Sequence, residues 1–588
     1  MGRKAPLILY LISILGLFCL IYNLFTLKYC VTAGYLVNIY NQLPQTFWVI
    51  LVITFFLGAI LVLCNNYPTF RIIGAFILLL NYFIFLMIPY ELGYFSFNYA
   101  DDLTYLGEVY DIKRTGHFNP DDFYPATHIF YAQVSCLLDI MPNILSFTMP
   151  AFFSFTFIGG TAIFSKLFIK EKVVIYLLLP VCLIYYLRYM HFSIAPHYSY
   201  YTLMPLFLFL LYKYSLEEKN VPSWNLTILP FILSIPLGHP FITIFAACIL
   251  FIPILIKRFL RLKLNSTGSF LAILLVTTLT WLTNCYFLLH FFGKSFNAFV
   301  ERIIQPVALK GVSYIAKANQ VVTPAELCRT IVLLYGRYLF PFIVIAIALI
   351  IILLDRKKKI PFNREYKFLV IFFVALGIID GFFIFNPVFT HTIQRVTTLN
   401  YFTYIMIPLL ALSLYTIFLR KLSGARILAT AVVLAIIQGI SLTGALPSPR
   451  THETNFGVPY EEVTAMQWLF DEKGNDPVLS VLDPQIASRF CDLFYGWSEK
   501  NQRKDINRYH YIVPDHFGYN DDENEHYKYK GQYVITLYQI KRIYTDVYRF
   551  SKNQDVLMRF TAEDYDRFNN DPNVNKIFDN RIIEVSKS

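Results

Sequence analysis

Residues 99 to 130 read YADDLTYLGEVYDIKRTGHFNPDDFYPATHIF, a polar and acid-rich stretch between hydrophobic segments too long for a soluble core. An apolar run of about twenty residues is long enough to cross a bilayer as a helix. The stretch is therefore predicted to leave the membrane and to lie on its surface. It holds two pairs of neighbouring carboxylates, Asp101 with Asp102 and Asp121 with Asp122. We expect the chemistry of the protein to be located here.

The composition excludes an ordinary soluble protein. Of 588 residues, 56% are hydrophobic and 15% are charged, a balance typical of multi-pass membrane proteins. Residues 447–588 hold 18 Lys and Arg against 23 Asp and Glu, whereas residues 1–446 hold 32 against 16. The excess of positive charge therefore lies in the hydrophobic part of the chain, where basic loops set the orientation in the membrane. This charge does not indicate nucleic-acid binding, so we expect the lipid bilayer as a partner and no nucleic acid.

Thirteen apolar runs are long enough, or nearly so, to span a bilayer. They lie near residues 6–28, 46–64, 70–89, 144–165, 173–188, 198–214, 224–239, 241–256, 269–292, 331–354, 367–387, 396–418 and 425–446. With the N-terminus inside, most Lys and Arg fall in inside loops, as the positive-inside rule requires. We predict an α-helical polytopic membrane protein with about 13 transmembrane helices and a cytoplasmic N-terminus, in the plasma membrane.

Two units are expected from the change in composition at residue 447. Residues 1–446 are predicted to form a transmembrane domain with outward loops at 90–143 and 293–330. Residues 447–588 are predicted to form an extracytoplasmic domain. In this second unit, strand patterns such as VLSVLD and QYVITL alternate with amphipathic patterns such as YEEVTAMQWLF, which favours a small α/β domain.

The acid-rich stretch itself carries helical patterns. Leu103, Leu106 and Tyr110 recur at helical spacing, and Gly116 follows as a stop signal. A second helix is predicted near residues 126–140. The first acidic pair would stand where the first helix starts, so one of its members can act as an N-cap. The local pattern leaves open whether the pair caps a helix or performs chemistry.

Basic side chains are expected at the same face of the membrane, in several loops and helix ends. They are Arg188, His191, His197, His239, Arg337, His391 and Arg395. Carboxylates and cations that meet at a membrane surface suit a reaction on an anionic lipid. A carboxylate can take a proton from an attacking hydroxyl, and Arg, His or a metal can neutralise a departing phosphate. The plainer interpretation is that arginines at helix ends reach toward lipid headgroups.

This layout resembles the GT-C superfamily of membrane glycosyltransferases, which use sugars linked to polyprenyl phosphate. The resemblance rests on Asp101 and Asp102 in the first large outward loop, on the outward loop after the ninth apolar run, and on the outward α/β unit. In that family the first-loop Asp acts as a base or helps to hold a divalent cation. The resemblance implies catalytic roles for Asp101 and Asp102. A cation, Mg²⁺ or Mn²⁺, would take its ligands from Asp101, Asp102, Asp121 and Asp122.

The function implied is an inverting glycosyltransferase of the bacterial cell-envelope type. It would move a hexose or pentose from a polyprenyl-phosphate donor to a glycan, lipid or protein acceptor on the outer face. The basic residues named above would bind the donor phosphate. The sequence lacks the WWDYG motif of the catalytic oligosaccharyltransferase subunit, and FYGW at residues 494–497 is a poor substitute for it. Glycosylation of protein sequons is therefore not expected.

Two alternatives belong to other functional classes. A transporter or flippase for lipid-linked sugars would need polar residues near span centres and a paired-repeat layout. The centres of the apolar runs are almost uncharged and no repeat is evident. A non-catalytic envelope scaffold would keep its role after replacement of both Asp101 and Asp102.

Overall fold

The computed structural model describes most of the chain. The described residues are 4–30, 36–64, 67–97, 101–216, 221–260, 267–285, 288–290, 293–294, 297, 300, 322–354, 364–385, 399–420, 423–481, 485–500, 513–519, 526–527, 531–547 and 558–588. Of the predicted outward loop at 293–330, residues 301–321 lie outside these ranges. His391 and Arg395 also lie outside them.

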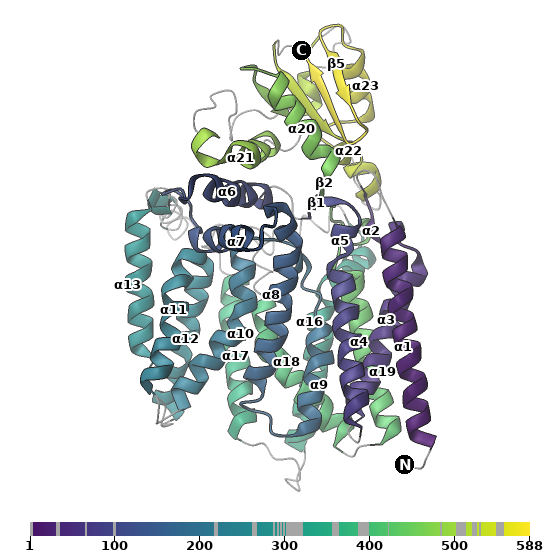
Figure 1. Cartoon of the computed structure of the whole chain (residues 1–588), viewed down its shortest axis with the longest axis vertical. Coiled ribbons are helices and arrows are strands. Elements are labelled where there is room, and N and C mark those ends of the chain that lie inside the picture. The colour runs from purple at the N-terminus through teal and green to yellow at the C-terminus, as the bar shows by residue number, and fades with distance from the viewer. Residues whose placement is uncertain are drawn as a thin grey trace.

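Long helices run side by side through the lower part of the molecule (Figure 1). Within the described ranges, a helix coincides with every one of the thirteen predicted apolar runs. These helices are α1 (Lys4–Tyr29), α3 (Gln45–Leu63), α4 (Pro68–Leu86), α8 (Pro142–Ser165), α9 (Lys172–Leu183), α10 (Pro196–Leu216), α11 (Val221–Gly238), α12 (Pro240–Leu260), α13 (Gly268–Asn284), α16 (Pro324–Leu354), α17 (Arg364–Phe385), α18 (Leu399–Leu414) and α19 (Gly424–Thr443).

Seven helices in the described part of the chain are long and apolar enough to cross a membrane. They include α1, α3, α4, α8, α16 and α19, together with residues Phe402–Leu419, where α18 continues into a π-helical turn, η3 (Tyr415–Leu419). Four further apolar helical segments are shorter. The protein is thus an α-helical membrane protein, and the count of thirteen spans stays a prediction.

One predicted run is shorter than expected. The run at 173–188 becomes α9, which ends at Leu183, and a separate 3₁₀ turn, η1 (Arg188–His191), follows it. Pro180 lies inside α9, where proline removes a backbone hydrogen bond and weakens the helix. The apolar run therefore gives a short helix followed by a buried loop.

Two helices of the acid-rich stretch lie across the end of the bundle that is opposite the N-terminus (Figure 1). They are α6 (Asp101–Thr115) and α7 (Pro125–Leu138), and they confirm the predicted helix pair. Gly116 follows α6 with a φ of 76°, a left-handed conformation that glycine adopts without strain. Short elements precede them: α2 (Ile39–Gln42), α5 (Ile88–Glu91) and β1 (Tyr94–Ser96).

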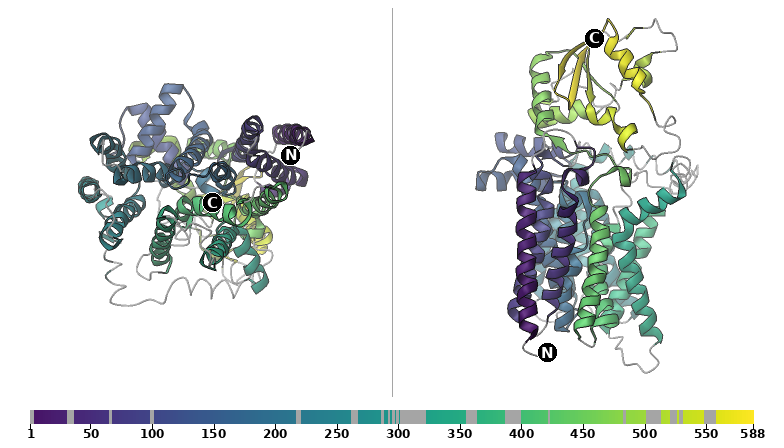
Figure 2. Two further views of the ribbon diagram at one scale, coloured as in Figure 1. Left: turned by 90° about the horizontal axis from the view of Figure 1, so that it is seen from below. Right: turned by 90° about the vertical axis from the view of Figure 1, so that its right-hand side faces the viewer.

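Above this layer stands a segment that mixes strands and helices (Figures 1 and 2). Its elements are η4 (Pro449–Thr451), β2 (Val458–Pro459), α20 (Tyr460–Glu472), β3 (Val478–Ser480), α21 (Gln485–Lys500), η5 (Asp515–Gly518), β4 (Tyr533–Leu537), α22 (Tyr538–Lys541), η6 (Ile543–Val547), α23 (Ala562–Asn570), β5 (Asn575–Asp579) and β6 (Ile583–Lys587). The described residues form a four-stranded sheet with the order β3-β4-β6-β5, in which β3 and β4 are parallel and the other two neighbouring pairs are antiparallel.

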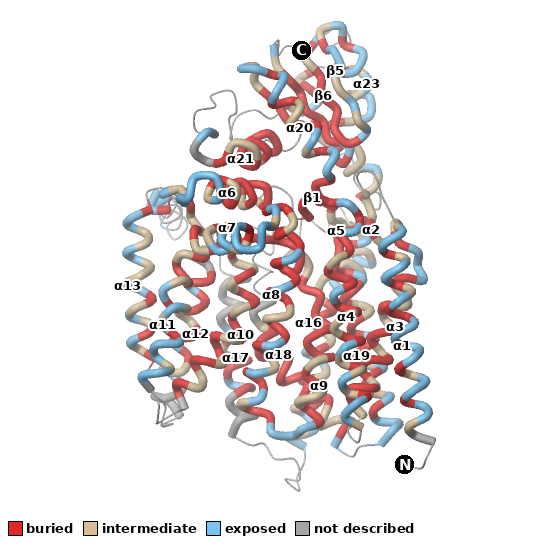
Figure 3. Tube along the Cα trace, viewed as in Figure 1, coloured by how far each residue is buried: buried red, intermediate tan, exposed pale blue. Residues whose placement is uncertain are grey.

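Strand pairing and helix packing both join this segment to the rest of the chain. Strand β2 pairs antiparallel with β1, and α21 packs along α6. Leu103, Leu106 and Val109 of α6 belong to the same buried cluster as Phe490 and Leu493 of α21. The burial is visible along both helices in Figure 3. Apolar side chains on both helices leave water together, which favours their association, and α6 is thereby held between the bundle and α21.

Candidate functional site

The first acidic pair lies in the opening turn of α6, and the structure separates its two members. Asp102 is fully buried, and its carboxylate accepts hydrogen bonds from Ser193 Oγ at 2.6 Å and from Ser96 Oγ at 3.4 Å. The Asp101 side chain is 50% exposed. Negative charge in a first helical turn is favoured by the helix dipole. Asp102 is therefore a buried anchor, and Asp101 is the member that solvent can reach.

Arg489 of α21 contacts the exposed member of the pair. Its guanidinium donates to Asp101 Oδ1 at 2.7 Å and to Thr104 Oγ1 at 2.8 Å. Thr104 in turn donates to Asp492 Oδ2 at 2.6 Å. A charge-assisted hydrogen bond is roughly twice as strong as a neutral one. Sequence reasoning missed Arg489 and Asp492, because nothing in the local pattern of α21 shows that its partner helix lies almost four hundred residues earlier.

The second acidic pair is also divided between two environments. Asp122 is buried and its Oδ2 lies 2.6 Å from Nδ1 of His128 in α7. The backbone N–H of Asp121 donates to Asn119 Oδ1 in the turn between α6 and α7, and the Asp121 side chain is partly exposed. The predicted turn is thus present, and the pair that it carries splits into a buried ion pair and a surface residue.

Glu108 completes a buried polar group between α6 and α7. Burial and the neighbouring Asp122 carboxylate raise the pKa of Glu108 to about 8. Burial lowers the pKa of His128, but the attraction of Asp122 and Glu108 outweighs burial, and the net result is a raised pKa. The Tyr105 ring lies 5.3 Å from the imidazole of His128, centroid to centroid. Buried groups with shifted pKa values are typical of functional sites and also of structural networks.

Two of the predicted basic residues meet beneath α7. The rings of His197 and His239 lie 5.0 Å apart, and Tyr124 stacks on His239 with centroids 4.9 Å apart. His197 Nδ1 is buried and has no hydrogen-bond partner among the described residues. Burial raises the pKa of the Tyr124 hydroxyl, and the charges of Asp101 and Asp122 add to this rise. Tyr124 therefore connects the imidazole pair to the first acidic pair.

Arg188 and Arg337 lie at a second position on the same end of the bundle. Arg188 has a φ of 60°, a left-handed conformation that is uncommon outside glycine, and it forms an ion pair with Glu453. Arg337 is buried, donates to the backbone carbonyls of Tyr186 and Leu334, and interacts electrostatically with Arg188. Non-glycine residues held in this backbone region are concentrated at functional sites.

His191 is a buried residue of the loop between α9 and α10. Its Nδ1 lies 2.7 Å from Ser154 Oγ, and its Nε2 lies 3.1 Å from Tyr82 Oη. Two residues later the same loop supplies Ser193 to Asp102. In this structure His191 holds the loop that connects the arginine pair to the acidic pair.

The predicted metal ligands do not converge in the described part of the chain. Asp101 pairs with Arg489, Asp102 accepts from two serines, and Asp122 pairs with His128. Among the described residues, no group of three His, Cys, Asp or Glu side chains could hold a metal ion. The geometry offers a half-exposed carboxylate, the Arg489 guanidinium beside it, and two further guanidinium groups, those of Arg188 and Arg337.

No protein-family model matches this chain, and no curated protein matches it.

Proposed function

We propose that this chain is a membrane glycosyltransferase that moves a sugar from a polyprenyl-phosphate donor to a cell-envelope acceptor. The reaction takes place between the membrane bundle and the C-terminal segment. In this proposal the thirteen helices named above all span the membrane, the N-terminus is cytoplasmic, and residues 447–588 form an α/β domain outside the plasma membrane. The proposal rests on the different environments of two adjacent carboxylates: Asp102 is buried and Asp101 is half exposed.

The two carboxylates supply what a base at a membrane surface needs. A catalytic base must be within hydrogen-bond reach of the proton that it abstracts, and it must be held in place. Asp102 fixes the first turn of α6 through its serine hydrogen bonds. Asp101, one residue earlier and half exposed, accepts the proton of the acceptor hydroxyl. A single buried carboxylate would have no access to an acceptor.

The position of Arg337 suits the phosphate of a lipid-linked donor. Arg337 precedes the end of α16 at Leu354 by 17 residues, or about 26 Å at the helical rise. The sequence RKKK at residues 356–359 marks the opposite membrane surface. Because the hydrocarbon core is about 30 Å thick, Arg337 lies near the boundary where a headgroup phosphate sits. Arg188 lies close to it.

The chemistry is a single displacement at the anomeric carbon. The acceptor oxygen loses its proton to Asp101 and forms the new bond to this carbon, while the bond from the carbon to the phosphate oxygen breaks. The electron pair of that bond leaves with the polyprenyl phosphate, and the guanidinium groups of Arg188 and Arg337 stabilise the charge that develops. Attack from the side opposite the leaving group inverts the configuration.

The test is sugar transfer by the purified full-length protein in lipid vesicles. The donors are a panel of radiolabelled polyprenyl-phosphate sugars, and the variants are Asp101→Asn and Asp102→Asn. Asp139→Asn is the matched control, because Asp139 is an exposed carboxylate at the end of α7 with a φ of 51°, a conformation that asparagine also tolerates. We expect transfer to fall by at least a hundredfold in Asp101→Asn and to be unchanged in Asp139→Asn.

The outcomes separate the three functional classes. Loss of transfer in Asp101→Asn, with the melting temperature retained, supports the base assignment. Full transfer in both Asp101→Asn and Asp102→Asn contradicts it. If the wild type transfers no sugar but moves a lipid-linked sugar across the vesicle membrane, the protein is a flippase. If it does neither, and both substitutions leave the cellular phenotype intact, the scaffold alternative holds.

A further inference from the structure

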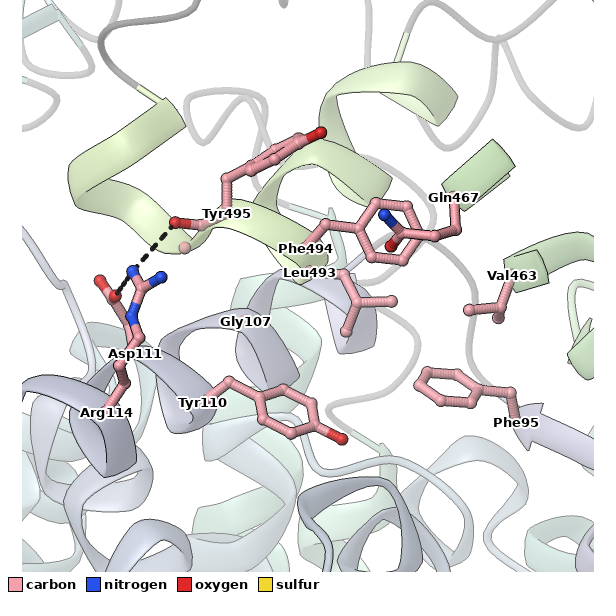
Figure 4. Close-up of a pocket in the computed structure, with 11 residues that line it drawn as sticks. Phe95, Gly107, Tyr110, Asp111, Arg114, Val463, Gln467, Leu493, Phe494 and Tyr495 are labelled. Atoms are coloured by element: carbon pink, nitrogen blue, oxygen red, sulfur yellow. Dashed lines mark hydrogen bonds and ion pairs between the residues drawn. The ribbon is translucent and has the colours of Figure 1, made fainter. Parts of the chain in front are cut away.

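A cavity of about 430 Å³ lies between α6, α20 and α21, beside β1. Figure 4 shows the side chains that line it. The residues are Phe95, Gly107, Tyr110, Asp111, Arg114, Val463, Gln467, Leu493, Phe494, Tyr495 and Gly496. We call this cavity the seam pocket, because it follows the seam between α6 and α21. Its volume is in the range of pockets that bind small molecules, about 300–1,000 Å³.

The lining combines aromatic rings with a few polar groups. Phe95, Tyr110, Phe494 and Tyr495 provide rings, and the Gln467 amide and the Asp111 carboxylate provide hydrogen-bonding groups (Figure 4). This is the general composition of a ligand site, where apolar walls supply contact area and a small number of polar groups fix orientation. Aromatic rings offer large flat faces against which the C–H face of a sugar ring can pack.

The charges of the pocket compensate each other. Arg114 donates to Asp111 at 2.8 Å and to Glu499 at 2.8 Å, and it also donates to the carbonyl oxygen of Tyr495 at 3.4 Å. A phosphate or an acidic chain would therefore find its cation already engaged by two carboxylates. The Gln467 amide donates to Asp471 at 3.1 Å and, together with the Asp111 carboxylate, gives the pocket a polar edge that a purely apolar occupant would not use. A neutral ligand with several hydroxyl groups fits both the rings and the polar edge.

The pocket lies on the same side of α6 as the candidate base. Asp101, Thr104, Gly107, Asp111 and Arg114 recur at spacings of three and four residues, which places them in one line along the helix. The contacts of this line with Arg489, Asp492 and Glu499 show that it faces α21. Tyr110 follows Asp101 by nine residues, or about 13 Å along the helix. The base and the pocket therefore lie along one line of α6, with the contact of Thr104 with Asp492 between them.

Two glycines allow this close approach. A Cβ atom at Gly107 would collide with the backbone carbonyl of Asp492, and a Cβ atom at Gly496 would collide with the carboxyl group of Asp111. Gly496 also has a φ of 66°, which favours glycine. Both glycines line the pocket, so a larger residue at either position would collide with the opposite wall and change the shape of the pocket.

We propose that the seam pocket binds a neutral oligosaccharide, as the part of a glycan acceptor that lies beyond the hydroxyl to be glycosylated. This inference rests on the proposed function and adds that the acceptor is carbohydrate. The base acts on the end of the glycan at Asp101, and the pocket holds a sugar unit farther along the chain. The pocket therefore determines which glycan is accepted, while the donor is bound elsewhere.

The experiment measures binding and transfer separately, with the full-length protein in nanodiscs. The probes are neutral gluco-, manno-, galacto- and chito-oligosaccharides, and binding is followed by saturation-transfer NMR. The variants are Gln467→Met, which removes the amide at similar size, and Tyr110→Leu, which removes a ring. The controls are Thr464→Val, on an exposed position of α20, and Tyr538→Leu, on an exposed tyrosine of α22; neither residue lines the pocket.

We expect at least one oligosaccharide class to bind to the wild type and to both controls. Its affinity should fall at least tenfold in Gln467→Met and in Tyr110→Leu. In the transfer assay these two variants should raise the acceptor KM and leave the donor KM unchanged. If Tyr110→Leu does not fold, a photoreactive derivative of the bound sugar should label the segment around Tyr495 in the wild type.

The proposal is overturned if no oligosaccharide of the panel binds, or if binding is the same in Gln467→Met and the wild type. It is also overturned if the pocket takes up an apolar peptide in preference to every sugar. Because binding is measured without a donor, a wild type that binds oligosaccharide but transfers nothing contradicts the transferase proposal and leaves the pocket assignment standing.

Discussion

The guanidinium of Arg489 lies 2.7 Å from the carboxylate of Asp101, although the two residues are 388 positions apart in the chain. Asp101 opens a helix that lies on the membrane bundle, and Arg489 belongs to the segment that covers this helix. The contact gives the half-exposed carboxylate a fixed partner and joins α6 to α21.

Replacement of Arg489 by Ala should loosen α21 from α6 and reduce sugar transfer. Hydrogen bonds to charged groups contribute about 1.5–3 kcal/mol, and Arg489 makes two side-chain contacts with α6. We expect faster amide hydrogen exchange in the first two turns of α6 and a tenfold or greater fall in transfer. Glu499→Gln is the control, because Glu499 pairs with Arg114 on the surface with both side chains half exposed, where ion pairs contribute about 0–1 kcal/mol. Equal exchange in Arg489→Ala and the wild type would contradict this view of the contact.

The two serines around Asp102 should differ in importance. Ser193→Ala removes the 2.6 Å hydrogen bond to a buried carboxylate, and weakening the solvation of such a group costs about 1–3 kcal/mol. Ser96→Ala removes a bond of 3.4 Å, which is long for a hydroxyl donor and should cost less. Melting temperatures in detergent test the order. A larger loss in Ser96→Ala would show that Asp102 is held in some other way.

Stability should fall as the pH rises from about 5 to about 8, because of Glu108. Its raised pKa, about 8, means that the folded protein keeps a proton that the unfolded chain has already lost above its ordinary value near 4.5. The raised pKa of His128 acts in the same direction, since its contribution is full below about 6.5 and is lost as the pH passes the higher folded value.

Glu108→Gln tests this pH dependence directly. The amide keeps the size of the side chain and cannot ionise, so the variant should lose less stability than the wild type between pH 5 and pH 8. The exposed Glu472 provides the control Glu472→Gln, which should follow the wild type. Melting curves at several pH values give the comparison, and parallel curves for wild type and Glu108→Gln would refute the role assigned to Glu108.

Gly107→Ala should separate α21 from α6. The added methyl group meets the backbone of Asp492, which cannot move without moving α21. We expect a lower melting temperature, loss of transfer, and loss of a disulfide engineered between the two helices. Gly159→Ala in α8 has open space around the added group, and alanine is favoured over glycine by about 1 kcal/mol in a helix. It should be neutral or stabilising, and a matching loss in both variants would point to a general effect of the substitution.

The sequence by itself was sufficient for the elements. Each predicted apolar run coincides with a helix among the described residues, because runs of apolar residues must satisfy their backbone hydrogen bonds internally in a bilayer. The spacing of Leu103, Leu106 and Tyr110 predicted α6, and Gly116 predicted its end. In the C-terminal segment, YEEVTAMQWLF became α20 and QYVITL contains β4. Each of these signals depends only on residues that are close together in the sequence, so the sequence alone is sufficient to predict the element.

The tertiary structure alone decided how the side chains meet. No pattern in the sequence distinguishes Asp101 from Asp102, since both are acidic and adjacent. Their environments differ because Asp102 is buried and accepts a hydrogen bond from Ser193, in a loop ninety residues later, whereas Asp101 is half exposed. The meeting of His197 with His239, and of Arg489 with Asp101, likewise joins positions with no fixed spacing. Helical period and hydrophobicity fix which face of an element is buried, but the partner that buries it is chosen by packing across the whole chain.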